Sequence, residues 1–108
     1  MRTTLARTPA LVDRLFTAGE RAYAEAATDP TERFAVRFAA KEAAMKVLGV
    51  GLGAVDWHDI EVVRVASGAP ELRVTGRAHE LAVDAGIRSW LVTLTHTASM
   101  AEAVVVGL

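Results

Sequence analysis

The period of the hydrophobic positions changes near Gly49, and the residues before that glycine have the spacing and the start signals of helices. Thr8-Pro9 fits an N-cap residue followed by proline at the first helical position, where the missing N–H is not needed. Thr17 and Glu20 have the spacing of a capping box, in which a hydroxyl and a carboxylate each satisfy a free backbone N–H. The pattern therefore predicts a helix that starts at the proline and a second helix over residues 18–27.

The strongest start signal lies at residues 29–32, where Asp-Pro-Thr-Glu combines an N-cap residue, a proline and a capping-box glutamate. No further proline or glycine occurs before Gly49. A glycine at that place suits the left-handed conformation that ends many helices. We predict a long helix over residues 30–48 with Gly49 as its C-cap.

Downstream of the long helix, the alternation of side chains is typical of strands. Residues 60–65 alternate between two faces, residues 67–70 read Ser-Gly-Ala-Pro, and a second short apolar segment follows at residues 72–74. This order predicts two strands joined by a tight turn. Residues 77–85 return to helical spacing, and Gly86 is the expected end of that helix.

The C-terminal part of the chain predicts two more strands. Trp90, Val92 and Leu94 share one face of the segment 88–95, which indicates a strand buried on one side. Residues 101–107 contain a run of valines dense enough for a central strand. Three helices, two strands, one helix and two strands in this order predict an α+β fold in which an antiparallel sheet packs against helices.

Composition favours one globular domain that spans residues 1–108. Hydrophobic residues make up 52% of the chain and the mean hydropathy is +0.27, which excludes disorder caused by low hydrophobicity. Twelve Lys and Arg against thirteen Asp and Glu give a net charge of -1, without the cationic field that is typical of nucleic-acid binders. Any anion site must therefore be local, and we expect no nucleic-acid partner.

The chain contains no cysteine, which excludes disulfides, thiolate metal sites and a cysteine nucleophile. Any metal must therefore be bound by carboxylate or imidazole. Asp13 and Arg14 interrupt the N-terminal apolar residues before a signal-peptide core can form. The apolar run at residues 103–106 is far shorter than the roughly 20 residues that span a bilayer. We expect a cytoplasmic protein that does not associate with a membrane.

Arg33, Arg37 and Lys41 follow one another at four-residue intervals, which stacks three cations on one stripe of the long helix. This stripe is either a solvated face relieved by neighbouring glutamates or a surface that binds an anion. Glu42 lies beside Lys41 and four residues before Lys46, a spacing that suits an ordinary surface ion pair. The same residues suit a magnesium–phosphate assembly, because Mg²⁺ takes one or two protein carboxylates together with phosphate oxygens and waters.

Residues 49–53 form a glycine-rich segment that follows a helix. This order excludes Rossmann and P-loop nucleotide sites, which need a strand before the glycines and a helix after them. The segment is either a flexible connection or a set of backbone N–H groups that approach a phosphate. His96 ends a predicted strand, where a structural hydrogen-bonding role and a catalytic role both fit. No Ser-His-Asp arrangement is indicated.

Four motifs in a fixed order give the chain a family resemblance. They are Arg-Phe-Ala-Ala-Lys-Glu-Ala-Ala-Met-Lys at 37–46, Trp-His-Asp-Ile-Glu-Val at 57–62, Ser-Gly-Ala-Pro-Glu-Leu at 67–72 and Val-Thr-Leu-Thr-His at 92–96. With residues 7–17, which look like the family's first helix, they closely resemble holo-acyl-carrier-protein synthase, the small trimeric type of 4′-phosphopantetheinyl transferase. The resemblance covers essentially the whole chain and implies the α+β fold of that family.

The resemblance implies magnesium-dependent transfer of 4′-phosphopantetheine from coenzyme A to a serine of an apo acyl carrier protein, with release of 3′,5′-ADP. It implies that Glu42 is a magnesium ligand and that Glu42 and Lys46 are catalytic residues. The serine proton passes either to Glu42 or to a metal-bound water. The coenzyme A site implied by the same motifs consists of Lys41, Lys46, Gly51, Gly68, Pro70, Thr95 and His96.

The family further implies a homotrimer with its sites at subunit interfaces and a role in fatty-acid biosynthesis and lipid metabolism. Its carrier proteins are acidic. Arg14 and Arg21, near the family's docking helix, are therefore expected to contact the carrier protein and to steer its approach.

Two features depart from the family pattern. The family's first strand carries a Gly-Ile-Asp-like motif whose aspartate is the second magnesium ligand, and the segment from Met1 has no counterpart of it. Asp13 and Asp59 are the nearest substitutes, and weaker magnesium binding is expected. Ala69 stands where many relatives carry Lys or Arg. Three interpretations follow, in order of preference: an active transferase, a non-catalytic relative that binds coenzyme A or a carrier protein, and a structural trimer-forming domain.

Overall fold

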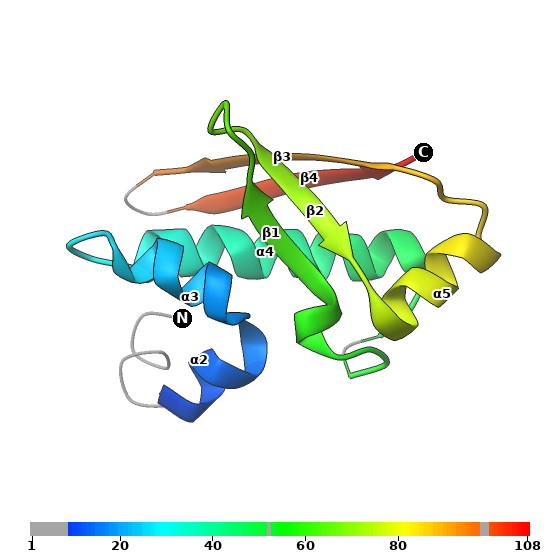
Figure 1. The fold of residues 1–108 in the computed structure, drawn as a ribbon, viewed down its shortest axis with the longest axis horizontal. Helices are drawn as coiled ribbons and strands as arrows, with labels where there is room; N and C mark the ends of the chain where they lie inside the picture. The colour runs from blue at the N-terminus through cyan, green and yellow to red at the C-terminus, as the bar shows by residue number, and fades with distance from the viewer. Residues whose placement is uncertain (1–8, 52, 98–99) are drawn as a thin grey trace.

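The computed structural model describes residues 9–51, 53–97 and 100–108, and its elements follow the predicted order (Figure 1). The elements are α2 (Pro9–Leu15), α3 (Ala18–Glu25), α4 (Thr31–Leu48), the 3₁₀ helix η1 (Trp57–Asp59), β1 (Ile60–Arg64), β2 (Pro70–Val74), α5 (Gly76–Asp84), β3 (Trp90–His96) and β4 (Ala101–Gly107). The single-turn η1 is the one element in this series that the sequence pattern did not predict.

Helices α2 and α3 begin where the capping chemistry predicted. α2 begins at Pro9, while its predicted N-cap, Thr8, lies outside the described residues. α3 has a full capping box: the Glu20 N–H donates to Thr17 Oγ1 over 3.2 Å, and the Thr17 N–H donates to Glu20 Oε1 over 3.0 Å. The helix ends at Glu25, short of the predicted end at residue 27.

Helix α4 begins one residue later than predicted, because Pro30 is the N-cap and not the first helical residue. The Thr31 N–H still donates to Asp29 Oδ1 over 3.1 Å. At the other end, Gly49 has the left-handed conformation, with φ 73°, and its N–H donates to the carbonyl oxygen of Lys46. The predicted C-cap is confirmed.

The strands form two antiparallel pairs, with β1 beside β2 and β3 beside β4. The predicted hairpin is confirmed, and Ile60 lies opposite Val74. The prediction of a central strand over residues 101–107 is wrong, because within the described part of the chain β4 pairs with β3 alone. Since α4 packs on only one face of this pair, alternate side chains such as Val104, which is 60% exposed, face away from the helix.

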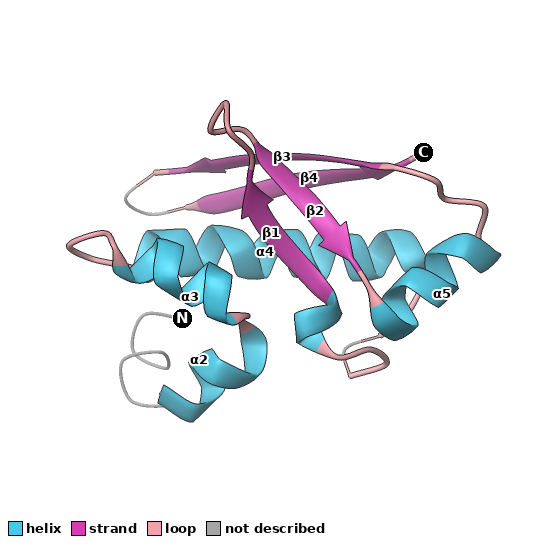
Figure 2. Ribbon diagram, in the orientation of Figure 1, coloured by secondary structure: helices cyan, strands magenta, loops and turns pink. Residues whose placement is uncertain are grey.

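The elements are arranged around α4, which runs the length of the molecule (Figures 1 and 2). The pair of β3 and β4 lies along one side of α4, and β1 and β2 cross over the same helix. α2 and α3 pack near one end of α4 and α5 packs near the other. This arrangement confirms the predicted α+β class, with two small sheets in place of one.

The hydrophobic core consists of two clusters that meet at Trp57. One contains Met45 and Ile60, and the other contains Phe16 and Phe34; these four side chains are at most 4% exposed. Trp57 and Trp90 are partly buried, and both pack against the first cluster. No helix in the described part of the chain is long and apolar enough to cross a bilayer.

Candidate functional site

An open groove of about 320 Å³ lies between α4 and β4. Its lining consists of Ala39, Glu42, Ala43 and Lys46 from α4 and residues 101–104 from β4. Glu42 and Lys46 are one helical turn apart, so their side chains lie on the same face of α4. The alanines on that face have only methyl groups, which leaves the groove open. It therefore presents a carboxylate and an ammonium on one accessible surface.

Glu102 is also among the residues that line this groove, and the sequence analysis did not name it. It lies opposite Thr95 in the register of β3 and β4, next to the strand end that carries His96. The sequence does distinguish Glu102, because it is the only charged residue of β4. Because Glu102 is exposed and two residues from Val104, its side chain lies on the face of the strand pair that turns away from α4, which does not make it a partner of Glu42.

The oxygen ligands of the groove fit Mg²⁺. This ion usually keeps several waters and phosphate oxygens beside one or two protein carboxylates, and Glu42 supplies one from α4. Among the described residues, no group of three or more His, Cys, Asp and Glu side chains is placed to hold a metal. The groove therefore suits a metal that a bound phosphate helps to hold.

Four charged residues named from the sequence lie outside the lining of the groove. Asp13, one candidate for the second magnesium ligand, has its Oδ1 3.1 Å from Arg21 Nη1. Asp59, the other, accepts the Arg77 N–H at Oδ2 over 3.2 Å. Of the two predicted carrier-protein contacts, Arg14 is exposed at the end of α2, whereas Arg21 is occupied by Asp13.

Lys41 does not reach the groove. Its side chain is 0% exposed, with Nζ 2.7 Å from Glu20 Oε1, 2.9 Å from the Trp57 carbonyl oxygen and in contact with the Ile60 carbonyl oxygen. Burial lowers the pKa of Lys41 below its usual value, and the charge of Glu20 opposes this shift. The burial contradicts both the solvated-face interpretation at this position and the implied contact of Lys41 with coenzyme A.

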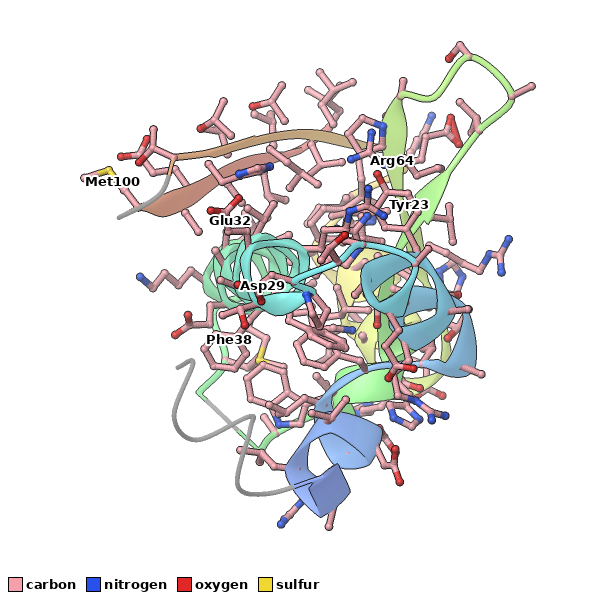
Figure 3. All side chains as sticks on the ribbon, turned by 90° about the vertical axis from the view of Figure 1, so that its left-hand side faces the viewer. Tyr23, Asp29, Glu32, Phe38, Arg64 and Met100 are labelled. Atoms are coloured by element: carbon pink, nitrogen blue, oxygen red, sulfur yellow. The ribbon has the colours of Figure 1, made fainter. Side chains whose placement is uncertain are left out.

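Three arginines surround the ring of Tyr23, which Figure 3 shows beside Arg64. The guanidinium carbons of Arg33, Arg37 and Arg64 lie 4.3, 4.2 and 4.9 Å from the ring centroid, within the range of cation–π contacts. Arg37 is only 2% exposed, and its Nε and Nη2 have no hydrogen-bond partner among the described residues. Burial lowers the pKa of Arg37, and the charge of Arg64 lowers it further.

A cavity of about 200 Å³ adjoins this cluster, and its lining includes Tyr23, Arg37, Glu61 and Arg64. The Glu61 carboxylate accepts a hydrogen bond from Thr17 Oγ1 over 2.5 Å and lies 3.3 Å from Arg73. An anion in the cavity would supply the acceptors that the buried guanidinium lacks. The anion interpretation of the cationic stripe therefore still fits Arg37, and the solvated-face interpretation does not.

His96 is paired with Glu32, with 3.0 Å between Nδ1 and Oε2. The contact joins the end of β3 to the first turn of α4, where Figure 3 labels Glu32. Both side chains are nearly half exposed. His96 thus has a partner, as the structural interpretation expected. Its side chain is also accessible to a ligand, as the catalytic interpretation requires. Its neighbour Thr95 is exposed.

The three remaining members of the implied coenzyme A site lie apart from the groove lining. Gly51 is exposed in the segment that follows α4. Gly68 occupies the turn of the hairpin with φ 86°, a conformation that favours glycine, and Pro70 begins β2. The implied site residues therefore fall into separate groups on the surface of one copy of the chain.

Comparison with known proteins defines the class of the enzyme. Residues 2–98 match the family model of the 4′-phosphopantetheinyl transferase superfamily. A holo-[acyl-carrier-protein] synthase from Frankia casuarinae is 50% identical over 104 residues, 96% of this chain and 83% of that protein. The synthase from Streptomyces avermitilis is 46% identical over 106 residues, 98% and 85% of the two chains.

Two solved structures support the same class. The crystal structure of holo-[acyl-carrier-protein] synthase from Neisseria meningitidis has a TM-score of 0.83 at 30% identity and covers 99% of this chain and 86% of its own. The Helicobacter pylori synthase in complex with coenzyme A has a TM-score of 0.82 at 26% identity, with 99% and 89% covered. The chain belongs to the holo-[acyl-carrier-protein] synthase family of 4′-phosphopantetheinyl transferases, which confirms the resemblance drawn from the four motifs.

Proposed function

We propose that this protein transfers 4′-phosphopantetheine from coenzyme A to a serine of an apo acyl carrier protein, with Mg²⁺ and with release of 3′,5′-ADP. The observation that supports this proposal best is the groove in which Glu42 and Lys46 present a carboxylate and an ammonium on one accessible surface of α4. Acidic oxygens beside a lysine suit a metal and a pyrophosphate together. The names of the relatives agree with this activity.

In this reaction the serine oxygen forms a bond to the phosphorus that carries pantetheine, and the bond from that phosphorus to the bridging oxygen of 3′,5′-ADP breaks. Phosphoryl transfer depends mainly on positioning and on neutralisation of charge. Mg²⁺, held by Glu42 together with oxygens of the bound phosphates, would neutralise their charge. Lys46 contributes a positive charge from the same face of α4, and the serine proton passes either to Glu42 or to a metal-bound water.

We further propose that the protein works as a homotrimer. Leu91, Val104 and Val106 are exposed by 57%, 60% and 41% on the face of β3 and β4 that turns away from α4. Such an apolar face is typical of an interface with another chain. Contact between copies would also explain why Gly68, Pro70, Thr95 and His96 lie apart from the groove, since each site would combine residues from two copies.

The acyl carrier protein is proposed to dock beside the N-terminal helices, in a role in fatty-acid biosynthesis. Arg14 is the better of the two candidates for a contact, because its side chain is exposed and Arg21 is paired with Asp13. An exposed arginine steers an acidic partner more than it fixes affinity. Arg21 would join this contact only by leaving its intramolecular partner.

Mass spectrometry of an apo acyl carrier protein tests the proposed reaction. The carrier protein is incubated with the chain, coenzyme A and Mg²⁺, in parallel with the variants Glu42→Ala and Glu80→Ala. We expect the mass of phosphopantetheine to be added by the wild-type chain and by Glu80→Ala, an exposed change on α5 far from the groove lining, but not by Glu42→Ala. Binding of coenzyme A without any mass gain would support the non-catalytic relative instead.

A further inference from the structure

Lys41 and Glu20 form a buried ion pair that joins three elements. Both side chains are 0% exposed, and Lys41 Nζ lies 2.7 Å from Glu20 Oε1. The same carboxylate accepts the Thr17 N–H at Oε1 and the Val62 N–H at Oε2, over 3.0 and 2.8 Å. The glutamate thus connects the start of α3 with β1, and the lysine adds α4 to this connection.

Lys41 uses all of its hydrogen-bond donors inside the protein. An ammonium group has three N–H donors. Their acceptors here are the Glu20 carboxylate and the carbonyl oxygens of Trp57 and Ile60, the first residues of η1 and β1. No N–H donor of Lys41 is left for a phosphate. Its contacts instead anchor α4 to α3, η1 and β1.

The anchor lies on the face of α4 next to the one that carries Glu42. Glu42 follows Lys41 and is turned about 100° around the helix, because an α-helix has 3.6 residues per turn. When Lys41 points into the core, Glu42 therefore points toward β4. The helix also buries Phe34, Val36 and Met45, which hold its apolar face against the core. The polar contacts of Lys41 are directional, so they add a specific rotation to this apolar packing.

We propose that Glu20 and Lys41 are positioning residues for the active site: Lys41 does not touch coenzyme A, and the pair holds α4 in the rotation that directs Glu42 into the groove. This inference rests on the proposed function, in which Glu42 holds Mg²⁺ and Lys46 faces the phosphates. It gives the two lysines of the chain different roles.

Chemical labelling of the intact wild-type protein tests whether Lys41 contacts coenzyme A. Because Lys41 and Lys46 are the only lysines in the sequence, mass spectrometry after acetylation reports on each of them. We expect Lys46 to be acetylated without coenzyme A and protected by it, and Lys41 to be acetylated only after unfolding in urea. Acetylation of native Lys41 that coenzyme A suppresses would overturn the proposal. Protection of neither lysine would instead count against the proposed function, since coenzyme A would not occupy the groove.

The positioning role is tested with Lys41→Met and with Val36→Ala, a change at another buried residue of α4. Both are studied at temperatures where circular dichroism shows them folded. Calorimetric titration with Mg²⁺ in the presence of coenzyme A should show about 10-fold weaker metal binding for Lys41→Met, as is typical when a group behind a metal ligand is removed. The kcat should fall with it, while the KM for coenzyme A changes by less than about twofold.

Val36→Ala should lose stability but keep the Mg²⁺ affinity and kcat of the wild type. A folded Lys41→Met variant with unchanged Mg²⁺ affinity and kcat would refute the positioning role. If this variant does not fold, Glu20→Gln combined with Lys41→Met leaves no unpaired buried charge and is measured in the same way.

Discussion

Burial decides what each cation on the long helix can do. Lys46 is exposed in the groove, whereas Lys41 is completely buried on another face of the same helix. The sequence predicted the stripe of Arg33, Arg37 and Lys41 from its spacing, but spacing does not say which element packs against a stripe. Because α3 and β1 cover this stripe, Arg37 and Lys41 are buried. At Lys41, neither the solvated-face interpretation nor the anion-binding interpretation therefore holds.

Glu20→Ala should destabilise the protein by about 3–5 kcal/mol, because it removes one partner of a buried pair and leaves the Lys41 ammonium without its counter-charge. The variant also loses the capping box and the bond to the Val62 N–H. Urea unfolding followed by circular dichroism measures the loss. Glu25→Ala, an exposed change at the end of the same helix, serves as the control and should stay within about 0.5 kcal/mol of the wild type.

At the scale of elements, the sequence predicted best where local chemistry decides. The start of α3 and the end of α4 depend on side chains and a glycine within one helical turn, and both were predicted correctly. The position of β4 depends on which strands pair with it, and the density of its valines predicted a central strand wrongly. The groove beside β4 could not be predicted from the sequence either, because it forms only when β4 packs against α4.

Gly49→Ala should cost about 1–2 kcal/mol of stability, because alanine at φ 73° adopts the left-handed conformation that its Cβ disfavours. The matched control is Gly51→Ala, where an added Cβ also meets no atom within 4 Å but φ is not in the left-handed region. The control should change stability by less than about 0.5 kcal/mol. Equal effects of the two substitutions in thermal unfolding would show that backbone strain is not the cause.

At the scale of the whole molecule, the order of four motifs predicted the family correctly, although the site residues that it implied are dispersed over one copy of the chain. Glu42 and Lys46 share the groove, while Gly68 and His96 belong to the hairpin and to the end of β3. A sequence does not show which surfaces of neighbouring copies meet. The assembly proposed above would bring these groups together.

Leu91→Glu should therefore dissociate the proposed trimer and reduce the transferase activity with it, because a charge would enter an apolar interface from a residue outside the groove lining. Size-exclusion chromatography with light scattering measures the mass of the assembly. Val83→Glu provides the control, since Val83 is similarly exposed, at 58%, on α5. A wild-type chain that runs as a monomer would contradict the proposed assembly, and so would a trimer that both variants leave intact.

The capping box of α3 has a consequence for the order in which the chain folds. Glu20 caps its own helix through one oxygen and binds Val62 of β1 through the other, so the helix gains its full stability only after a strand 42 residues away has docked. Helices this short have little stability alone. Native-state hydrogen exchange should therefore show the amides of α3 opening together with those of β1, in one cooperative unit. Exchange of α3 well before β1 would show that the local cap is sufficient.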